Sequence, residues 1–524
     1  MVLDTGWGDG SDFLKLIDRW LNEHTGGKML HYVGVADSMP RGGWTPDLRD
    51  TLGALGPGFH RFTLCNGRVS LTLCIGPLQT MLSEQAMQAD TVFFKSQEPT
   101  WDKWSIKALA KCCAPGAQIE VDAAWALPRG IPNALTDAGF QPQARHGSTV
   151  QTYTYAPPWQ VRKRPGAARV AAPAQHCAVI GGGLAGASVA HALAQRGWQV
   201  DVYDEHAHCA AGASGLPVGL VAPHVSADDS PRSRLSRSGA RLMLAHAAQL
   251  LHEGEDWAPT GVLEYRRPPL EPLWHAQAGW IKPARLVQAW LSHRGIQFHA
   301  KARVNSLRHS DHGWVLESSD GRTLSRTGHV VFANAYGCHA LLEPLGLSTT
   351  LQQVHGTLSH GRQPVPRALA PDCPVNGHGS FVYGIPTAQG PQWFAGATYE
   401  ADATRLADVP AQHRANLQRL RELMPTMADA LSAAFASGDV SAWTGTRCVT
   451  RDRLPLVGPL QAGDDNTLWI SAGMGSRGLS FSALCAELLA SQMCAEPLPV
   501  EASLVRSLHA QRARARDQAS AQTF

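Results

Sequence analysis

A glycine-rich turn between two short apolar segments constrains the fold of this chain more than any other feature. The stretch "CAVIGGGLAGASVAHALAQRGWQVDVYDEH" begins at Cys177. Its first residues, through Ile180, are typical of a buried strand, and residues 184–196 form an alanine-rich helical run. The segment "WQVDVYD" then alternates as a second strand that ends at Asp204. Strand, tight turn, helix and strand in this order predict a dinucleotide-binding βαβ unit.

Each glycine of this GxGxxG turn has a separate physical role. Gly181 permits the tight turn, Gly183 lets the backbone approach a pyrophosphate, and Gly186 lets the helix pack closely on the strand. The helix N-terminus then offers free N–H groups to the phosphates. Asp204 is placed to accept hydrogen bonds from ribose hydroxyls, and its carboxylate disfavours a 2′-phosphate. The unit is therefore expected to bind NAD or FAD rather than NADP.

Three other segments favour FAD. "AAGASGLPVGLVAP" (210–223) follows the second strand, and "HVVFANAYG" (329–337) is a strand that runs into a turn of small residues. "LWISAGMGSRGLSFSALCAELLASQM" (468–493) repeats strand, glycine loop and helix. Small residues let a backbone pass close to a flat ligand, and a second helix N-terminus adds a positive dipole. The expected cofactor contacts are Gly181, Gly183, Gly186, Asp204, Gly212, Ala213, Ser214, Ala333, Gly473, Gly475, Ser476, Arg477 and Gly478.

The composition of the chain changes at residues 157–176, which are rich in Pro, Ala and Arg and read as a linker. We expect a smaller domain at 1–156 and a larger one at 177–524. The FAD-binding parts are expected at about 177–260, 300–345 and 445–510, and the substrate part at about 261–299 and 346–444. The expected fold class is α/β and α+β: a Rossmann-like domain, then an FAD domain with an inserted mixed-sheet substrate domain.

Charge and cysteine content narrow the function further. The formal net charge is +3 over 524 residues, so contacts with nucleic acid must come from local patches. The candidate patches are Arg162, Lys163, Arg164 and Arg169 in the linker and Arg506, Arg512, Arg514 and Arg516 near the end; the alternative is that these charges are only solvated. Eleven cysteines without a CxxC pair predict reduced thiols, and no metal site is expected. We find no signal peptide and no membrane-spanning run, so a cytoplasmic location is expected.

Four stretches resemble a known family. They are "GASG" (212–215), "GWIKPARLVQAWL" (279–291), "GTRCVTRDRLPLVG" (445–458) and "GSRGLSFSALCAELLASQMCAEPLP" (475–499). They are similar to the D-amino-acid oxidase-like FAD enzymes, which include glycine and sarcosine oxidases, and within that group to the oxidoreductase half of the MnmC family. The resemblance implies removal of the carboxymethyl group from carboxymethylaminomethyl-(2-thio)uridine at the tRNA wobble position, which gives aminomethyl-uridine.

The resemblance also implies the role of Arg447. The segment "GTRCVTRDRLPLVG" is similar to the GxRPxTxDxxPxxG pattern in which the arginine binds the substrate carboxylate, with Cys448 in place of proline. A guanidinium fork suits a carboxylate. The alternative is an internal ion pair between Arg447 and a residue such as Asp452. Arg451 and Arg453 are the next candidates for the carboxylate clamp. Arg477 could approach the flavin or RNA, or lie on the surface.

The N-terminal domain resembles the methyltransferase half of the same family. "DTGWGDGSDFL" (4–14) is similar to its S-adenosylmethionine loop, although little strand precedes Asp4. Ala36 stands where the resemblance expects a ribose-binding acid, and Lys95 stands where it expects an aspartate. A lysine cannot help to hold an amine beside a cationic sulfonium. We therefore expect methyl transfer to be lost, and whether the loop still binds S-adenosylmethionine stays open. The short first strand suggests that the sheet lacks a strand.

Three functions stay open at this point. The first is an FAD-dependent oxidoreductase of tRNA with a degenerate methyltransferase-like domain that serves as a docking module. The second is a small-molecule amine oxidase of the glycine or sarcosine type. The third is a non-catalytic tRNA-binding protein that holds a flavin for structure. In the segment "TWDKW", Trp101 and Trp104 are expected in the core rather than at a stacking surface.

Overall fold

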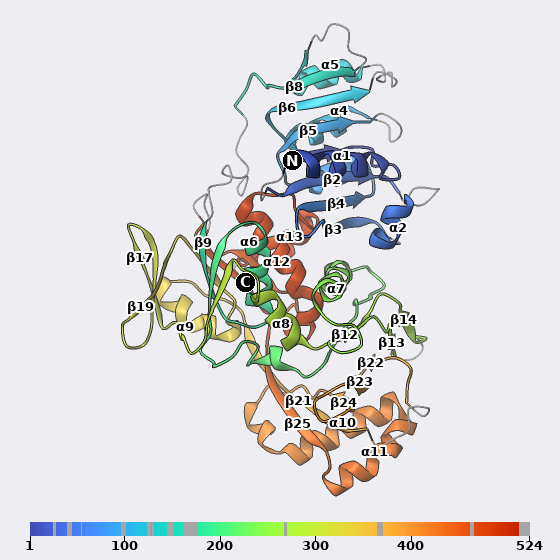
Figure 1. Cartoon of the computed structure of the whole chain (residues 1–524), viewed down its shortest axis with the longest axis vertical. Coiled ribbons are helices and arrows are strands. Elements are labelled where there is room, and N and C mark those ends of the chain that lie inside the picture. Colours follow the sequence, from blue (N-terminus) through green and yellow to red (C-terminus); the bar gives the residue numbers. More distant parts are fainter. Residues whose placement is uncertain are drawn as a thin grey trace, which may run out of the picture. The chain divides into compact units, whose positions relative to one another are not determined.

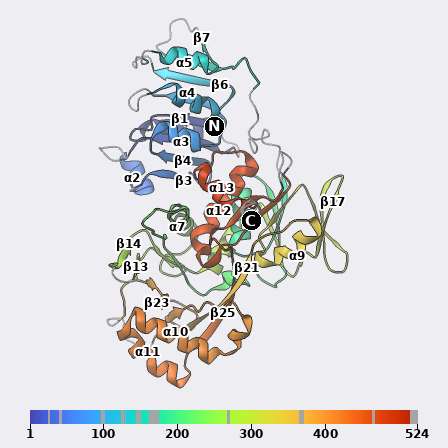
Figure 2. The same ribbon diagram turned by 180° about the vertical axis from the view of Figure 1, so that it is seen from behind.

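A computed structural model describes residues 1–24, 28–38, 44–53, 55–95, 101–122, 127, 130–143, 150–160, 175–266, 270–363, 370–461 and 466–512. The chain forms two compact units. Unit 1 comprises Met1–Pro173 and Leu488–Arg506, and unit 2 comprises Ala174–Glu487 and Ser507–Phe524. Residues 488–506, which the sequence groups with the second domain, thus belong to unit 1. Figures 1 and 2 show the elements of both units from opposite sides.

Unit 1 is built on an eight-stranded sheet. In spatial order the strands are β3 (Gly58–Leu64), β4 (Val69–Ile75), β2 (Leu30–Ala36), β1 (Val2–Asp4), β5 (Ala89–Phe94), β6 (Cys113–Asp122), β8 (Val150–Tyr155) and β7 (Phe140–Gln143). The short β1 pairs in parallel with both β2 and β5 at the centre. The expectation of a missing strand is therefore wrong, because three residues are enough to fill this position.

Helices cover both faces of this sheet. Successive residues of a strand point to opposite faces, and here both sets are buried, so both faces need a cover. Leu3 and Val33 face the core shared with α3 (Leu78–Glu84), α4 (Lys103–Lys111) and α5 (Ile131–Asp137). Val2 and Tyr32 face the opposite core, which contains α1 (Ser11–Glu23) and α2 (Pro46–Leu52). The Rossmann-like prediction for this unit is confirmed.

Unit 2 contains a six-stranded sheet that carries the GxGxxG turn. Its order is β16 (Ile296–His299), β10 (Gln199–Tyr203), β9 (His176–Ile180), β20 (His329–Phe332), β27 (Leu468–Ala472) and β26 (Leu456–Pro459), with only the β26–β27 pair antiparallel. The helix α6 (Leu184–Gln195) follows β9, and α12 (Gly478–Cys494) follows β27. These are the two strand–loop–helix units that the sequence predicts. Both turns lie at the carboxyl ends of parallel strands, β9 and β27, which are separated in the sheet by β20, and ligands bind at such ends.

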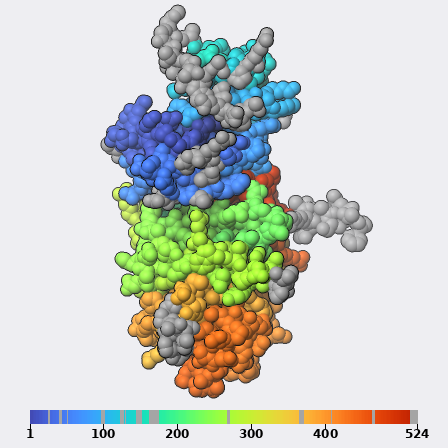
Figure 3. Space-filling view, turned by 90° about the vertical axis from the view of Figure 1, so that its right-hand side faces the viewer, coloured from blue at the N-terminus to red at the C-terminus, as the bar shows by residue number. Residues whose placement is uncertain are grey.

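The second large sheet of unit 2 is the inserted one. It consists of β14 (Leu273–His275), β13 (Val262–Glu264), β22 (Val375–Gly377), β23 (Gly379–Ile385), β24 (Gln392–Gly396), β21 (Gln352–Arg362) and β25 (Ser441–Val449). The helices α10 (Val409–Leu423) and α11 (Pro425–Ser437) pack on it and form the orange surface in Figure 3. Two boundaries differ from the sequence-based division: β16 pairs with β10 of the FAD sheet, and the end of β25 belongs to the inserted sheet.

The remaining elements of unit 2 are α7 (Pro231–Leu250), α8 (Pro283–Leu291), α9 (Cys338–Leu342), β11 (Gly219–Val221), β12 (Trp257–Ala258), β15 (Gly279–Ile281), β17 (Ser306–Ser310), β18 (Gly313–Glu317) and β19 (Thr323–Thr327). They include two small sheets, ordered β11–β15–β12 and β17–β18–β19. In unit 1 the short helix α13 (Ala502–Leu508) begins in the C-terminal segment. In the described part of the chain, no helix is both long enough and apolar enough to cross a membrane. None of the eleven cysteines forms a disulfide bond.

Candidate active site

A pocket of about 450 Å³ in unit 2 brings the two glycine turns together. All the expected contacts line it except Gly186 and Arg477. The pocket also reaches Arg447 on β25, so the site extends from the FAD sheet to the inserted sheet. A region that unites two helix N-termini with a guanidinium group suits a long, anionic dinucleotide and a small carboxylate substrate.

The geometry of the first turn explains its glycines. Gly181 has φ of +110°, and a Cβ atom there would lie 2.7 Å from the carbonyl oxygen of Ala333. A Cβ atom on Gly183 would lie 2.9 Å from Ser214 Oγ, at the wall of the pocket. A Cβ atom on Gly186 would overlap the carbonyl oxygen of Gly181. Gly186 thus lies behind the pocket, where it allows α6 to pack on the turn.

Two polar side chains hold this turn in place. The N–H of Gly182 donates to Asp204 Oδ2 at 2.7 Å, and the other oxygen of Asp204 accepts from the N–H of His206 at 2.9 Å. Ser214 Oγ accepts from the N–H of Leu184 at 2.9 Å and so occupies one free donor of the α6 N-terminus. Asp204 Oδ1 also lies 2.8 Å from His206 Nδ1, so Oδ2 keeps one lone pair for a ribose hydroxyl, because each oxygen can accept two hydrogen bonds.

Arg447 is a half-buried cation on the wall of the pocket. Its Nη1 donates to the carbonyl oxygen of Thr398 at 3.3 Å, and burial lowers the pKa of Arg447. Among the described residues no carboxylate forms an ion pair with it. Asp452 instead pairs with Arg512, at 3.0 Å from Nε to Oδ2, so the alternative of an Arg447–Asp452 pair is wrong. A guanidinium group beside a pocket, with donors to spare, is suited to an incoming carboxylate.

The other arginines considered for this role lie elsewhere. Arg451 and Arg453 are exposed and do not line the pocket. Arg477 donates to the carbonyl oxygen of Ala222 at 3.1 Å, and burial lowers its pKa, so the surface alternative for Arg477 is wrong. The sequence reasoning missed Trp443, which lines the pocket. Trp443, Gly445 and Arg447 alternate along β25, and this period of two could have identified them as one face of a strand.

The described residues include only part of the linker and tail patches. Arg162, Lys163, Arg164, Arg169, Arg514 and Arg516 lie outside the described residues. Arg512 is bound internally to Asp452, which excludes it from a free basic patch. In the described part of the chain, no group of three or more His, Cys, Asp or Glu side chains is arranged to hold a metal ion.

In unit 1 the side chain of Lys95 packs against the glycine turn that follows β1. Lys95 Nζ lies 2.9 Å from Asp4 Oδ2 and 3.1 Å from Asp12 Oδ2. Asp4 is fully buried and also accepts from the Tyr32 hydroxyl at 2.7 Å and from the N–H of Gly6 at 3.0 Å. A Cβ atom on Gly6 would lie 2.7 Å from Lys95 Cβ, so the lysine stem packs against the turn. A fixed positive charge therefore stands beside the loop that resembles an S-adenosylmethionine site.

Replacing Lys95 with methionine should destabilise unit 1, because it leaves the buried Asp4 carboxylate without its cation. We expect the free energy of unfolding to fall by about 1.5–3 kcal/mol, as for a hydrogen bond to a charged group. Although burial alone would lower it, Asp4 and Asp12 hold the pKa of Lys95 above its ordinary value of 10.5. The stabilisation is thus fully present below pH 10.5 and is lost as the pH rises through the folded-state pKa.

Urea denaturation of the Lys95→Met variant measures this effect, with Lys15→Met as the control. Lys15 pairs with Asp12 on the exposed side of α1, where an ion pair contributes about 0–1 kcal/mol. Equal stabilities of the two variants would show that Lys95 does not neutralise Asp4.

Comparison with known proteins identifies the family. A family model described as FAD dependent oxidoreductase matches residues 176–273 and 266–492. The tRNA 5-methylaminomethyl-2-thiouridine biosynthesis bifunctional protein MnmC of Albidiferax ferrireducens is 43% identical over 98% of this chain and 92% of its own length. The protein of the same name from Polaromonas naphthalenivorans is 40% identical, over 95% of this chain and 88% of its own length. This chain belongs to the MnmC family.

MnmC membership and the family model together make this chain an FAD-dependent oxidoreductase, as the motifs predict. Among solved structures, a double-cysteine mutant of Amadoriase I from Aspergillus fumigatus is 16% identical to this MnmC-family chain, with a TM-score of 0.50 over 66% of this chain and 92% of its own. That likeness concerns the fold alone.

Proposed function

We propose that this protein removes the carboxymethyl group from carboxymethylaminomethyl-(2-thio)uridine at the tRNA wobble position and stops at aminomethyl-uridine. The single observation that carries the oxidative step is Arg447, a half-buried arginine on the pocket of the glycine turns that has no acidic partner among the described residues. The names of the relatives, which place them in the biosynthesis of 5-methylaminomethyl-2-thiouridine in tRNA, support the substrate. We place this reaction in the cytoplasm.

The residues of the pocket fit FAD. The turn at Gly181 and Gly183 leaves room for a pyrophosphate next to the α6 N-terminus, and Asp204 lies where the ribose of a dinucleotide is held. Gly473, Gly475 and Gly478 supply a second turn on the same pocket, beside the N-terminus of α12. When bound, FAD would accept a hydride from the α-carbon of the substrate.

The protein's part in the reaction is to orient the substrate. The substrate carries a secondary amine, a methylene α-carbon and a carboxylate. Arg447 would bind the carboxylate through its free N–H donors and so direct the α-carbon into the pocket. Loss of a hydride from the neutral amine leaves a carbon–nitrogen double bond, to which water adds. Cleavage of the carbon–nitrogen bond then releases glyoxylate and leaves the aminomethyl group on the nucleoside.

The stop after oxidation is supported by the lysine in unit 1. Methyl transfer requires a sulfonium ion and a neutral amine close together, and a carboxylate would favour this arrangement. Here Lys95 places a cation at that loop, and Asp4 and Asp12 are already bound to it. Ala36, at the end of β2, supplies no carboxylate for a ribose. We therefore propose that unit 1 has kept the methyltransferase fold without its chemistry.

Incubation with substrate tRNA, oxygen and labelled S-adenosylmethionine tests both parts of the proposal. After digestion, we expect aminomethyl-uridine without label. Label in a methylaminomethyl nucleoside would show that unit 1 still transfers methyl groups. If neither nucleoside forms while free sarcosine reduces the flavin, the protein is a small-molecule amine oxidase. A bound flavin that neither tRNA nor sarcosine reduces would indicate a non-catalytic role.

A further inference from the structure

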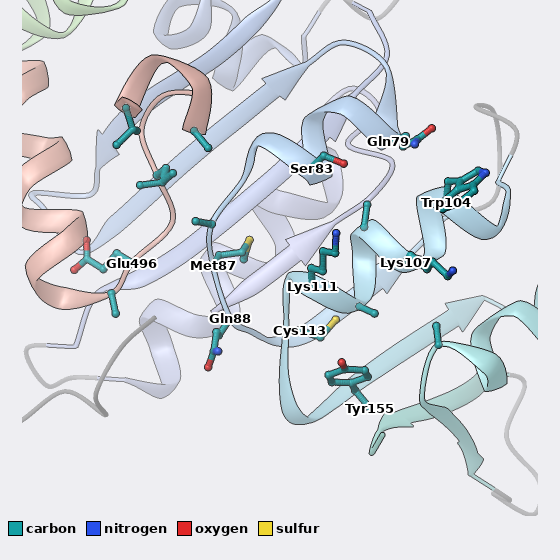
Figure 4. Close-up of a pocket in the computed structure, with 18 of the residues that line it drawn as sticks. Gln79, Ser83, Met87, Gln88, Trp104, Lys107, Lys111, Cys113, Tyr155 and Glu496 are labelled. Atoms are coloured by element: carbon teal, nitrogen blue, oxygen red, sulfur yellow. The ribbon is translucent and has the colours of Figure 1, made fainter. Parts of the chain in front are cut away.

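A second pocket, of about 650 Å³, lies within unit 1 and away from the glycine turn. Figure 4 shows Trp104, Lys107 and Lys111 along the helix α4, with Tyr155 of β8 on another wall. Trp159 and Arg506 also line it. The pocket belongs to the face of the sheet covered by α3, α4 and α5, opposite the face covered by α1 and α2.

Trp104 does not lie in the core, which corrects the sequence-based expectation. Trp101 is buried and stacks on Phe94 at 4.1 Å, as expected, but Trp104 is 52% exposed. Lys103 Nζ and Lys107 Nζ lie over its ring, at 5.1 and 5.0 Å from the centroid. The two cation–π contacts hold the lysine ammonium groups beside the ring, and the exposed part of the indole is open to a further partner.

The lysines of α4 form a stripe of like charge. Lys103, Lys107 and Lys111 are spaced four residues apart and all are exposed. Like charges at this spacing repel each other and destabilise a helix. No ion pair to any of the three occurs between residues that the structure describes. The acidic residues on the pocket wall are Asp137 and Glu496. Glu496 Oε1 lies 3.4 Å from His31 Nε2. An anionic partner would relieve the repulsion along the stripe.

We propose that this face of α4 docks tRNA, with phosphates along Lys103, Lys107 and Lys111 and an unpaired base stacked on Trp104. Cations that follow the backbone, combined with an aromatic platform, are how proteins bind single-stranded nucleic acid. An acidic peptide would use the lysines but has no need of the exposed indole. This inference rests on the proposed function, because it assigns the tRNA of that reaction to a surface of unit 1.

Equilibrium binding of substrate tRNA to the full-length holoenzyme over a range of salt concentrations tests the proposal. Replacing all three lysines with glutamine should flatten the log–log salt dependence by roughly 0.7–0.9 per lost phosphate contact. Trp104→Ala should weaken binding roughly 5- to 150-fold, the value of one stacked base, and Trp104→Phe should retain part of it. Flavin reduction at saturating tRNA should be unchanged in every variant, because none of these residues lines the flavin pocket.

The matched control replaces Lys15, Arg19 and Arg49 with glutamine. These residues are exposed on α1 and α2, on the opposite face of the same sheet, and the control removes the same total charge. Equal salt slopes for the two triple variants, with wild-type binding and reduction intact, would overturn the docking surface and leave the proposed function standing. Lost binding of polyglutamate with unchanged tRNA binding would assign the face to an acidic protein and also overturn it. Absence of tRNA-dependent reduction in the wild type would instead refute the proposed function.

Discussion

Replacing Gly183 with valine should yield a folded protein that retains less flavin than the wild type. The Cβ atom would stand 2.9 Å from Ser214 Oγ, and the two methyl groups would extend into the space expected for the pyrophosphate. Overpacking of this kind costs about 1–3 kcal/mol, which corresponds to roughly 5- to 150-fold weaker flavin binding. Flavin absorbance per protein after gel filtration measures the loss, and circular dichroism checks that the chain is folded.

Variants at two other glycines distinguish an effect on cofactor binding from an effect on folding. Gly186→Ala should reduce the yield of folded protein, because its conflict is with the backbone oxygen of Gly181 rather than with a ligand. Gly328→Ala should be neutral, since nothing lies within 4 Å of the added Cβ atom and the residue does not line the pocket. A Gly183→Val variant that keeps its full flavin content would show that the cofactor does not cross this turn.

Replacing Arg447 with alanine should slow flavin reduction by subsaturating tRNA while the protein stays folded and yellow. A charge-assisted hydrogen bond contributes about 1.5–3 kcal/mol, so a loss of roughly ten- to a hundredfold in kcat/KM is expected. Arg447→Lys should recover only part of this loss, because an ammonium group cannot form the paired bonds of a guanidinium fork. Stopped-flow measurement of flavin reduction gives these values directly.

Arg451→Ala is the control for this experiment. Arg451 follows the same strand, is exposed and does not line the pocket, so its removal should leave the rate of reduction unchanged. If Arg447→Ala reduces its flavin at the wild-type rate with limiting tRNA, or if Arg451→Ala loses as much, then another residue holds the substrate carboxylate.

Local sequence predicted the elements whose geometry depends on a few neighbouring residues. The strand, helix and strand around Gly181 form as β9, α6 and β10, and the second glycine turn precedes α12. The turn at Gly181 and the close helix–strand contact at Gly186 leave a direct trace in the sequence, since a Cβ atom at either position would meet backbone atoms. The prediction for β1 was wrong for a related reason. The sequence shows that this strand is short, but it does not show that β1 pairs with two neighbouring strands.

By itself, the sequence determined the family, the dinucleotide turn, and the unusual residues Ala36 and Lys95. Only the tertiary structure decided which charges meet. It pairs Asp452 with Arg512 rather than with Arg447, binds Lys95 to Asp4 and Asp12, and leaves Trp104 outside the core. The physical reason is that a turn or a helix is set by hydrogen bonds between near neighbours, whereas an ion pair and the exposure of a ring depend on residues brought together from distant parts of the chain.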